Sequence, residues 1–250
     1  MKTRPETDSI GTLNIPADTY YGVQSLRAKE NFNITGSGLH PLFIRNLACI
    51  KKAAAITNES AGTLEHTKAR AIIRACDEVI SGRFMEYFIV DAIQGGAGTS
   101  ANMNANEVIA NRASELLGGK KGSYFPVHPN DHVNMAQSTN DVIPTAGKLT
   151  VLDLLPALIE ALENLFEVLS DKSREFDSVL KMGRTQLQDA VPMRLGQTFH
   201  AYASMIRRDI ERLKDSRKVL YPLNMCGTAI GTQLMCLLTI LTTLYRSSPH

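Results

Sequence analysis

Apolar residues recur at helical spacing along most of the chain beyond residue 40. Intervals of three or four residues between them predict five helices, over about 42–60, 67–81, 103–117, 142–176 and 194–220. Pro41 suits the first turn of the first helix, and glycine follows each of the first three, where helices commonly end. Because strand signals are weak throughout, the pattern predicts a mainly α fold.

The two longest predicted helices indicate a helical bundle. The segment 142–176 would form a rod about 50 Å long at 1.5 Å per residue, bent rather than ended by Pro156. A loop over 177–192, longer than a bundle usually needs, joins it to the helix 194–220. Residues 1–40 are rich in Gly, Pro, Asn and Thr without sustained periodicity, so we expect an irregular arm there.

Composition and charge exclude several classes of protein. The 250 residues are enough for one large or two small domains with a buried core. With 27 basic and 25 acidic residues the net charge is +2, which lacks the basic excess of a nucleic-acid-binding protein. The N-terminus has no apolar leader, and no stretch of about 18 uncharged apolar residues qualifies as a membrane span, residues 234–245 coming nearest. We therefore expect a cytoplasmic protein with no nucleic-acid or membrane partner.

No residue pattern favours a metal site. His128 and His132 have the i, i+4 spacing of paired ligands, but Pro129 and the Asn-Asp that follow it predict a turn instead. The cysteines form no C-x-x-C pair and lie in apolar, helix-like surroundings. We expect them to be buried, reduced thiols; they are Cys49, Cys76, Cys226 and Cys236.

Three polar segments interrupt the helical pattern, each at a turn that enters a helix. They are GGAGTSAN at 95–102, AQSTND at 136–141 and GRTQLQDAVP at 183–192. Backbone amides at a helix start, together with hydroxyl and amide side chains, bind carboxylate groups without a formal positive charge. The segments therefore suggest a small dianionic ligand.

Each polar segment also has a purely structural interpretation. Ser-Thr-Asn-Asp before a helix is most often a cap, and GGAG, which matches no nucleotide-binding pattern, is a plain tight turn. Arg184 is expected to pair with a neighbouring carboxylate. The glutamates show no paired arrangement for glycosidase chemistry and are expected on solvated helix faces, at Glu115, Glu160, Glu163 and Glu167.

Taken together, the segments resemble the aspartase/fumarase superfamily in order and spacing. The matching runs cover residues 14–32, 95–113, 128–146 and 181–199, and the resemblance extends over roughly 11–232. Within the superfamily the chain is most similar to the aspartate-specific ammonia-lyases, because Gln186 stands where fumarases usually carry histidine. The resemblance implies reversible anti-elimination of ammonia from L-aspartate to give fumarate, with fumarate hydration as the nearest alternative.

The resemblance assigns roles to particular side chains. It implies that Thr99, Ser138 and Thr139 hold the β-carboxylate of the substrate and that Thr185 contacts the α-carboxylate. Asn140 and Gln186 would meet the ammonium group, and Gln186 can form hydrogen bonds there but cannot carry a proton. A second anion site is implied at the HPND turn, with His128, Asn130 and Asp131.

The resemblance also implies a domain organisation and an assembly. Residues 1–140 would form an N-terminal lyase domain and 141–232 part of a central helical bundle, around which the family forms homotetramers. We expect no cofactor and no metal ligand in this chain. The family's catalytic base, a serine on a mobile G-S-S-x-M-P loop, has no counterpart here, so we assign no catalytic residue and expect the chain alone to be inactive. A catalytically dead helical oligomerisation fragment is a further alternative.

The last residues depart from the pattern of the superfamily. Residues 233–250 contain a single charged residue, Arg246, where the average of the chain predicts about four. We interpret them as an aberrant tail, with the hypothesis of a frameshift or misplaced gene end after Thr232.

Overall fold

The computed structural model of the chain describes residues 2–232, so the predicted tail at 233–250 lies outside the described residues. The described chain forms two compact units. The first contains residues up to 150 and the segment that begins at 223, and the second contains residues 151–222. The sequence-based boundary at 140/141 lies earlier, because the first turns of the long helix beyond it, with Val142 and Ala146, are buried in the core of the first unit.

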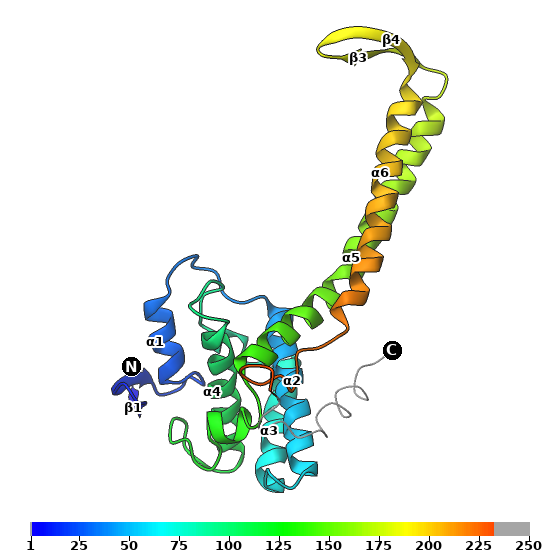
Figure 1. The fold of residues 1–250 in the computed structure, drawn as a ribbon. Helices are drawn as coiled ribbons and strands as arrows, with labels where there is room; N and C mark the ends of the chain where they lie inside the picture. The colour runs from blue at the N-terminus through cyan, green and yellow to red at the C-terminus, as the bar shows by residue number, and fades with distance from the viewer. Residues whose placement is uncertain (1, 233–250) are drawn as a thin grey trace. The chain divides into compact units, whose positions relative to one another are not determined.

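The first unit is built from helices that bury one another's apolar faces. Helix α2 packs against α3, and α4 packs against both (Figure 1). The predicted helices 42–60 and 67–81 are confirmed, whereas the third begins four residues before its predicted start, directly after the glycine-rich turn. The helical elements of this unit are α1 (Val23–Asn31), α2 (Pro41–Ser60), α3 (His66–Ile80), η1 (Met85–Tyr87), α4 (Thr99–Leu116), η2 (Pro129–Val133) and the start of α5 (Thr139–Glu175).

The N-terminal arm is more regular than the sequence predicts. Strand β1 (Thr3–Thr7) pairs antiparallel with β2 (Thr12–Pro16), and α1 follows. Arg4 donates to the carbonyl oxygens of residues 16, 17, 19 and 21, which ties the hairpin to the chain leading into α1. The expectation of an irregular arm is wrong because two five-residue strands with few apolar side chains have no detectable alternation.

The expectations of a solvated Glu115 and of cysteines that are all buried and reduced are also wrong. Glu115 does not lie on a solvated face, since it is half-buried and accepts hydrogen bonds from Tyr20 and Arg112. Cys76 is a buried free thiol as expected, but Cys49 is exposed and Cys226 is disulfide-bonded.

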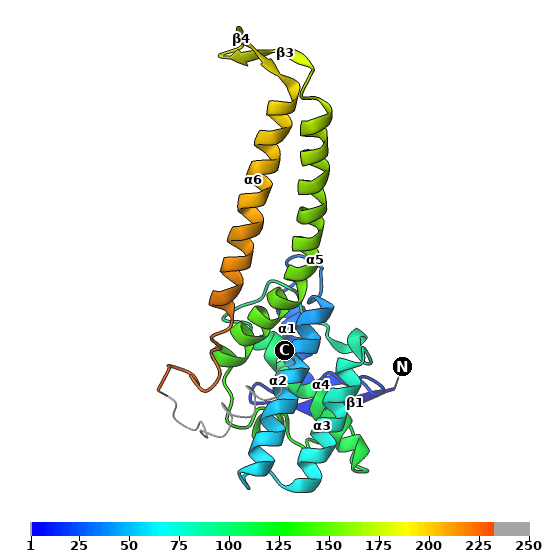
Figure 2. The same ribbon diagram turned by 90° about the vertical axis from the view of Figure 1, so that its right-hand side faces the viewer.

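The second unit is an antiparallel helix pair with a β-hairpin at its connection. The later part of α5 and α6 (Leu195–Ser216) lie side by side in both ribbon views, and η3 (Arg217–Leu220) follows α6 (Figures 1 and 2). The hairpin consists of β3 (Leu180–Thr185) and β4 (Gln188–Arg194). The sequence predicts a loop here, because the hairpin's strands are short and largely exposed, with Leu187 fully exposed at the turn.

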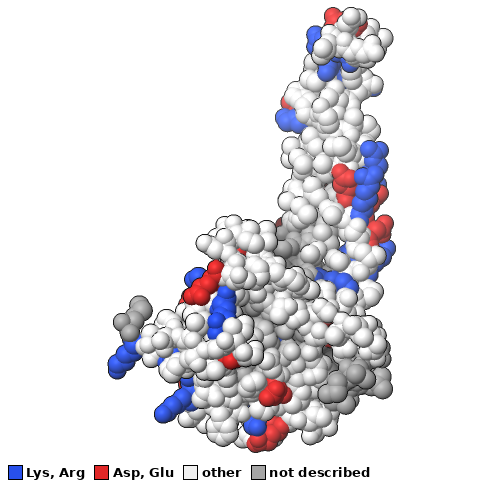
Figure 3. Space-filling view, turned by 60° about the vertical axis from the view of Figure 1, so that its left-hand side comes forward, with Lys and Arg blue, Asp and Glu red and all other residues white. Residues whose placement is uncertain are grey.

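The helix pair exposes many apolar side chains. Glu160, Glu163 and Glu167 are exposed as predicted, but so are apolar residues of both helices. Figure 3 shows basic and acidic side chains interspersed over one face, with long uncharged stretches on the helix pair. The exposed apolar residues are Val151, Leu154, Leu158, Leu165 and Val168 on α5 and Tyr202 and Met205 on α6. Such a surface is typical of helices that pack against further helices.

By length and composition alone, α5 is apolar enough to cross a membrane. This test tolerates two charged residues, whereas the sequence-based expectation concerned uncharged stretches, and α5 contains no uncharged stretch of 18 residues. A single such helix is weak evidence, because long core helices of soluble proteins pass the same test. Val142 and Ala146 at the start of α5 are indeed core residues of the first unit.

Gly196 lies close to the backbone at the end of α5 within the second unit. Its N–H donates to the Phe176 carbonyl (2.9 Å), and a Cβ at this position would overlap the Ser173 carbonyl oxygen and lie 2.9 Å from the Asp177 Cα. We expect Gly196→Ala to lower the free energy of unfolding by about 2 kcal/mol, because both neighbours are backbone atoms that cannot rotate away. Urea unfolding followed by circular dichroism measures this effect.

Gly147→Ala is the matched control for Gly196→Ala. Gly147 lies inside α5 with open space where a Cβ would stand. We expect this substitution to stabilise the chain by about 1 kcal/mol, since alanine favours the helix. Equal effects of the two substitutions would contradict the steric argument.

Candidate functional site

The N-termini of α4 and α5 meet in the first unit, and we call this place the α4–α5 junction. The Asn102 side-chain nitrogen on α4 lies 3.2 Å from Thr139 Oγ1 at the start of α5. A Cβ on Gly98, just before α4, would stand 2.9 Å from Ile143 Cγ2 of α5. The fold therefore brings together the predicted segments 95–102 and 136–141, which are far apart in the sequence.

The start of α4 requires the glycine-rich turn. Gly98 has a φ of 85°, in the left-handed region that glycine adopts without strain, and it also makes the close approach to α5. Thr99 is the first residue of the helix and is exposed. The Gln94 side-chain oxygen accepts from the Ala101 N–H (2.7 Å) and so satisfies one of the free amides of the first turn. Thr99 is thus presented at a helix N-terminus with its hydroxyl open to a ligand.

The start of α5 is capped by its own sequence. Ser138 Oγ accepts from the Asn140 N–H (3.3 Å), and Asp141 Oδ1 accepts from the Ser138 N–H (3.0 Å). Burial raises the pKa of Asp141. The interpretation of this segment as a helix cap is confirmed, and it does not exclude binding, because a serine hydroxyl that accepts one hydrogen bond still has a proton to donate.

The segment after 223 lies against the start of α5. Asn140 Nδ2 donates to the Ala229 carbonyl (2.7 Å), and Asp141 Oδ2 accepts from the Thr228 N–H (3.2 Å). The amide predicted to meet an ammonium group is therefore engaged by the chain itself in this structure. A ligand that used Asn140 would have to displace Ala229.

Thr185 and Gln186 belong to the second unit, so the structure does not place them with the α4–α5 junction. Both are exposed at the turn of the β3–β4 hairpin, where Thr185 pairs with Gln188 and Gln186 has a φ of 51°. Arg184 beside them donates to Asp189 Oδ1 (3.0 Å), which confirms that it pairs with a neighbouring carboxylate. Their assignment to a substrate stays a prediction.

The HPND turn is held together by its own histidines. His128 Nδ1 accepts from the N–H groups of Asn130 and Asp131 (both 3.2 Å), and His132 Nδ1 accepts from the His128 N–H (2.8 Å). Burial, and after it the charge of Lys68, lowers the pKa of His132. Within residues 2–232 no group of three or more His, Cys, Asp or Glu side chains forms a potential metal site. The second anion site predicted at this turn stays a prediction. In this structure the backbone N–H groups of Asn130 and Asp131 already donate to His128 Nδ1.

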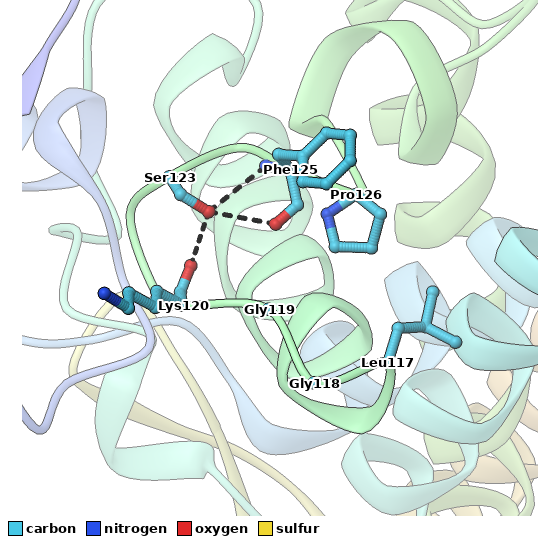
Figure 4. Close-up of a pocket in the computed structure, with 7 residues that line it drawn as sticks. All are labelled: Leu117, Gly118, Gly119, Lys120, Ser123, Phe125 and Pro126. Atoms are coloured by element: carbon cyan, nitrogen blue, oxygen red, sulfur yellow. Dashed lines mark hydrogen bonds between the residues drawn. The ribbon is translucent and has the colours of Figure 1, made fainter.

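A hollow of about 450 Å³ lies at the other end of α4 (Figure 4). Its polar atoms are mostly occupied, since Ser123 Oγ bonds to Lys120 O, Phe125 N and Phe125 O. The 18 residues of α4 separate it from Thr99 by about 27 Å. It is therefore distinct from the α4–α5 junction; its lining comprises Leu117, Gly118, Gly119, Lys120, Ser123, Phe125 and Pro126.

Sequence reasoning singled out Asn102 as part of the segment 95–102, but it predicted neither Lys51 nor Asn134 beneath the junction. Asn102 and Asn134 contact each other through their side chains, and Asn134 accepts from Lys51 (2.7 Å). Lys51 stands in an otherwise apolar helix stripe, and that position is the one signal that could have indicated a buried charge. Asparagine gives no such signal, because it is equally common in exposed turns.

Comparison with known proteins places the chain among lyases. The profile of a family described as "Lyase" matches residues 11–237. The chain belongs to this lyase family. Aspartate ammonia-lyases of Bacillus subtilis and Escherichia coli are 55% and 48% identical to it over 92% of the chain. The chain spans about half the length of the curated relatives it matches, 49% in both cases.

Solved lyase structures share the same fold. The cobalt-bound fumarate lyase:delta crystallin of Brucella melitensis is 50% identical with a TM-score of 0.91, over 97% of this chain and 53% of that one. The class II fumarase of Schistosoma mansoni is 39% identical with a TM-score of 0.88, over 97% and 51%. The mainly α fold predicted from the sequence is thereby confirmed as that of the lyase superfamily.

Proposed function

We propose that this lyase chain provides the carboxylate-binding part of an aspartate ammonia-lyase, which converts L-aspartate reversibly to fumarate and ammonia. The observation that carries the proposal is the α4–α5 junction, where Thr99, Ser138 and Thr139 stand at two helix N-termini brought together by the fold. The identity of 48–55% to aspartate ammonia-lyases of several bacteria supports the choice of substrate.

The chemistry explains why such a junction is useful. A base takes a proton from the carbon beside the β-carboxylate, the electron pair forms the carbon–carbon double bond, and the bond to the amino nitrogen breaks. Before that bond breaks, the negative charge spreads onto the β-carboxylate. Hydroxyl and backbone N–H donors fixed around that carboxylate stabilise the developing charge more than the ground state, and each is worth a few kcal/mol.

The remaining assignments follow the resemblance. We propose that Thr185 contacts the α-carboxylate and that Asn140 and Gln186 meet the amino group, which requires Asn140 to leave Ala229. The HPND turn, with His128, Asn130 and Asp131, is proposed as a second anion site. We propose that the chain contributes no general base and needs the second half of a lyase for turnover.

We further propose a cytoplasmic homotetramer built on the helix pair of the second unit. The exposed apolar residues of α5 and α6 support this assembly, because a surface of that kind is stable in water only when other helices cover it. A fumarase is the second candidate, favoured by the likeness to the Schistosoma mansoni enzyme. Gln186 favours the ammonia-lyase, since it cannot carry a proton to a leaving hydroxide.

A chimera tests the proposal: residues 1–232 of this chain joined to the second half of the Bacillus subtilis lyase. We expect it to release fumarate from L-aspartate and not from malate. Thr139→Val in the chimera is expected to reduce kcat/KM by about 10- to 100-fold, because one donor to the β-carboxylate is lost. The absorbance of fumarate, followed at steady state, measures the substrate preference of the chimera and the kcat/KM of the Thr139→Val variant.

Thr12→Val is the matched control for Thr139→Val. Thr12 lies in the N-terminal hairpin, where its hydroxyl contacts Thr7 alone among the bonds described. We expect wild-type turnover from this variant. Activity on malate but not on aspartate would replace the proposal by the fumarase alternative, and turnover by the 250-residue chain alone would refute the need for a second half.

A further inference from the structure

Lys51 on α2 is fully buried, at 0% exposure, and no other lysine or arginine within residues 2–232 is buried. Removing an ammonium group from water is costly unless its hydrogen bonds and charge are matched inside the protein. A methionine would fill the same space without that cost. The buried charge therefore calls for a role that an apolar side chain cannot perform.

Hydrogen bonds that begin at the amine of Lys51 connect four elements. It donates to Asn134 Oδ1 (2.7 Å), which follows η2. The same oxygen accepts from Asn102 Nδ2 on α4 (3.2 Å), and Asn102 Nδ2 also lies 3.2 Å from Thr139 Oγ1 at the start of α5. A continuous set of hydrogen bonds thus leads from the buried charge to a side chain of the α4–α5 junction.

In its protonated form, Lys51 sets the direction of every bond in this set. An ammonium group has donors and no acceptor, so it requires the oxygen end of the Asn134 amide. That oxygen in turn requires the nitrogen end of Asn102, whose two N–H groups then serve Asn134 and Thr139. Thr139 Oγ1 accepts a bond from Asn102 and keeps its own proton for another partner.

Lys51 also faces the cap of α5. Among the titratable groups that interact with it are Asp141 on α5 and Cys76 on α3, and of these Asp141 bears the opposite charge. Asp141 holds the N–H of Ser138 and so fixes the second hydroxyl of the junction. Protonated Lys51 therefore interacts electrostatically with the acidic residue that caps α5.

We propose that Lys51 is a positioning residue that, through Asn134 and Asn102, holds Thr139 as an acceptor and directs the Thr139 hydroxyl proton toward the carboxylate of the substrate. The inference deepens the proposed function and rests on it for the identity of the ligand. The internal geometry can be tested whether or not the enzyme acts on aspartate.

The first part of the experiment compares crystal structures of the chimera with Lys51→Met and Lys52→Met variants. Lys52 is the matched control, since it is the next residue on α2 and pairs with Asp77 at the surface. We expect Lys51→Met to break the contact between Asn102 Nδ2 and Thr139 Oγ1, and Lys52→Met to preserve it. An unchanged contact in Lys51→Met overturns the proposal. If Lys51→Met does not fold, Asn134→Ala interrupts the same set of hydrogen bonds. The contact between Asn102 Nδ2 and Thr139 Oγ1 is then expected to break in this variant, and an unchanged contact overturns the proposal.

The second part measures kinetics in the chimera with L-aspartate at pH 6, where Lys51 is protonated in the folded chain. We expect Lys51→Met to reduce kcat/KM by about 10- to 100-fold, as for loss of a charged hydrogen bond, and Lys52→Met to have no effect. In a Thr139→Val background, Lys51→Met should add little, because both act through one hydroxyl. A purely structural role would give equal, independent losses in both backgrounds, and that result overturns the proposal. No turnover by the unmutated chimera would refute the proposed function, while the crystal structures would still decide the role of Lys51.

Discussion

Replacing Glu107 by alanine is expected to lower the free energy of unfolding of the first unit by about 3–5 kcal/mol. The Glu107 carboxylate, 0% exposed on α4, accepts from the N–H groups of Gly22 (2.9 Å), Gln24 (2.9 Å) and Ser25 (3.1 Å) and from the Ser25 hydroxyl. These are the free amides at the start of α1, which need an acceptor when they are buried. Alanine would leave all of these amides without an acceptor. Urea unfolding followed by circular dichroism measures the resulting decrease in the free energy of unfolding.

Two variants show whether the hydrogen bonds cause that loss. Glu107→Gln keeps one acceptor oxygen but turns an NH₂ group toward N–H donors, so we expect an intermediate loss of about 2 kcal/mol. Glu86→Ala removes an exposed glutamate and is expected to change stability by less than about 0.5 kcal/mol. A loss in Glu107→Ala no larger than in Glu86→Ala would show that α1 is held by other contacts.

The stability of the chain relative to its Lys51→Met variant is expected to rise between pH 7 and pH 10. Burial lowers the pKa of Lys51 from 10.5 to about 7. Between these values the unfolded chain binds a proton that the folded chain does not, so stability increases with pH by about 1.4 kcal/mol per unit. The expected gain is about 3–4 kcal/mol over the range. Below pH 7 both states are protonated, and the full cost of burying the charge remains.

Urea unfolding of both proteins at pH 6, 7, 8, 9 and 10 measures this difference. Burial raises the pKa of Cys76, so its thiol titrates in this range only in the unfolded chain. Cys76 is present in both proteins, and its contribution cancels. Lys52→Met is the control and should keep a constant difference from wild type, because Lys52 is half-exposed. A difference between wild type and Lys51→Met that does not change with pH would show that Lys51 stays charged in the folded state.

Helices with a repeating apolar stripe could be predicted from the sequence, and short elements without one could not. Helices α2 and α3 begin and end within about two residues of their predicted bounds, because Pro41 and the following glycines mark their ends locally. The N-terminal hairpin and the β3–β4 hairpin were missed. Their strands are too short and too exposed to show an alternating pattern, and they are fixed by pairing between strands.

In the candidate site, too, features with a local sequence pattern could be predicted and features fixed by distant contacts could not. The segments that contain Thr99, Ser138 and Thr139 were singled out because each is a polar run before a helix, which is a local feature of the sequence, and the resemblance assigned these three residues within them. The hydrogen bonds beneath them were not predicted, although Asn102 lies in the segment 95–102. They join Lys51 to Asn134 and Asn134 to Asn102, positions that are 83 and 32 residues apart. No local pattern records such distant pairs.

The sequence by itself determined the mainly helical fold, because helical periodicity and helix caps depend on neighbours within a few residues. The resemblance of its polar segments indicated the lyase family. Only the tertiary structure decided that α4 and α5 present their N-termini together, that Asn140 is engaged by Ala229, and that a buried lysine lies behind Thr139. These features depend on which distant groups the packed core brings within hydrogen-bonding distance, and on the loss of water that makes each donor require an acceptor.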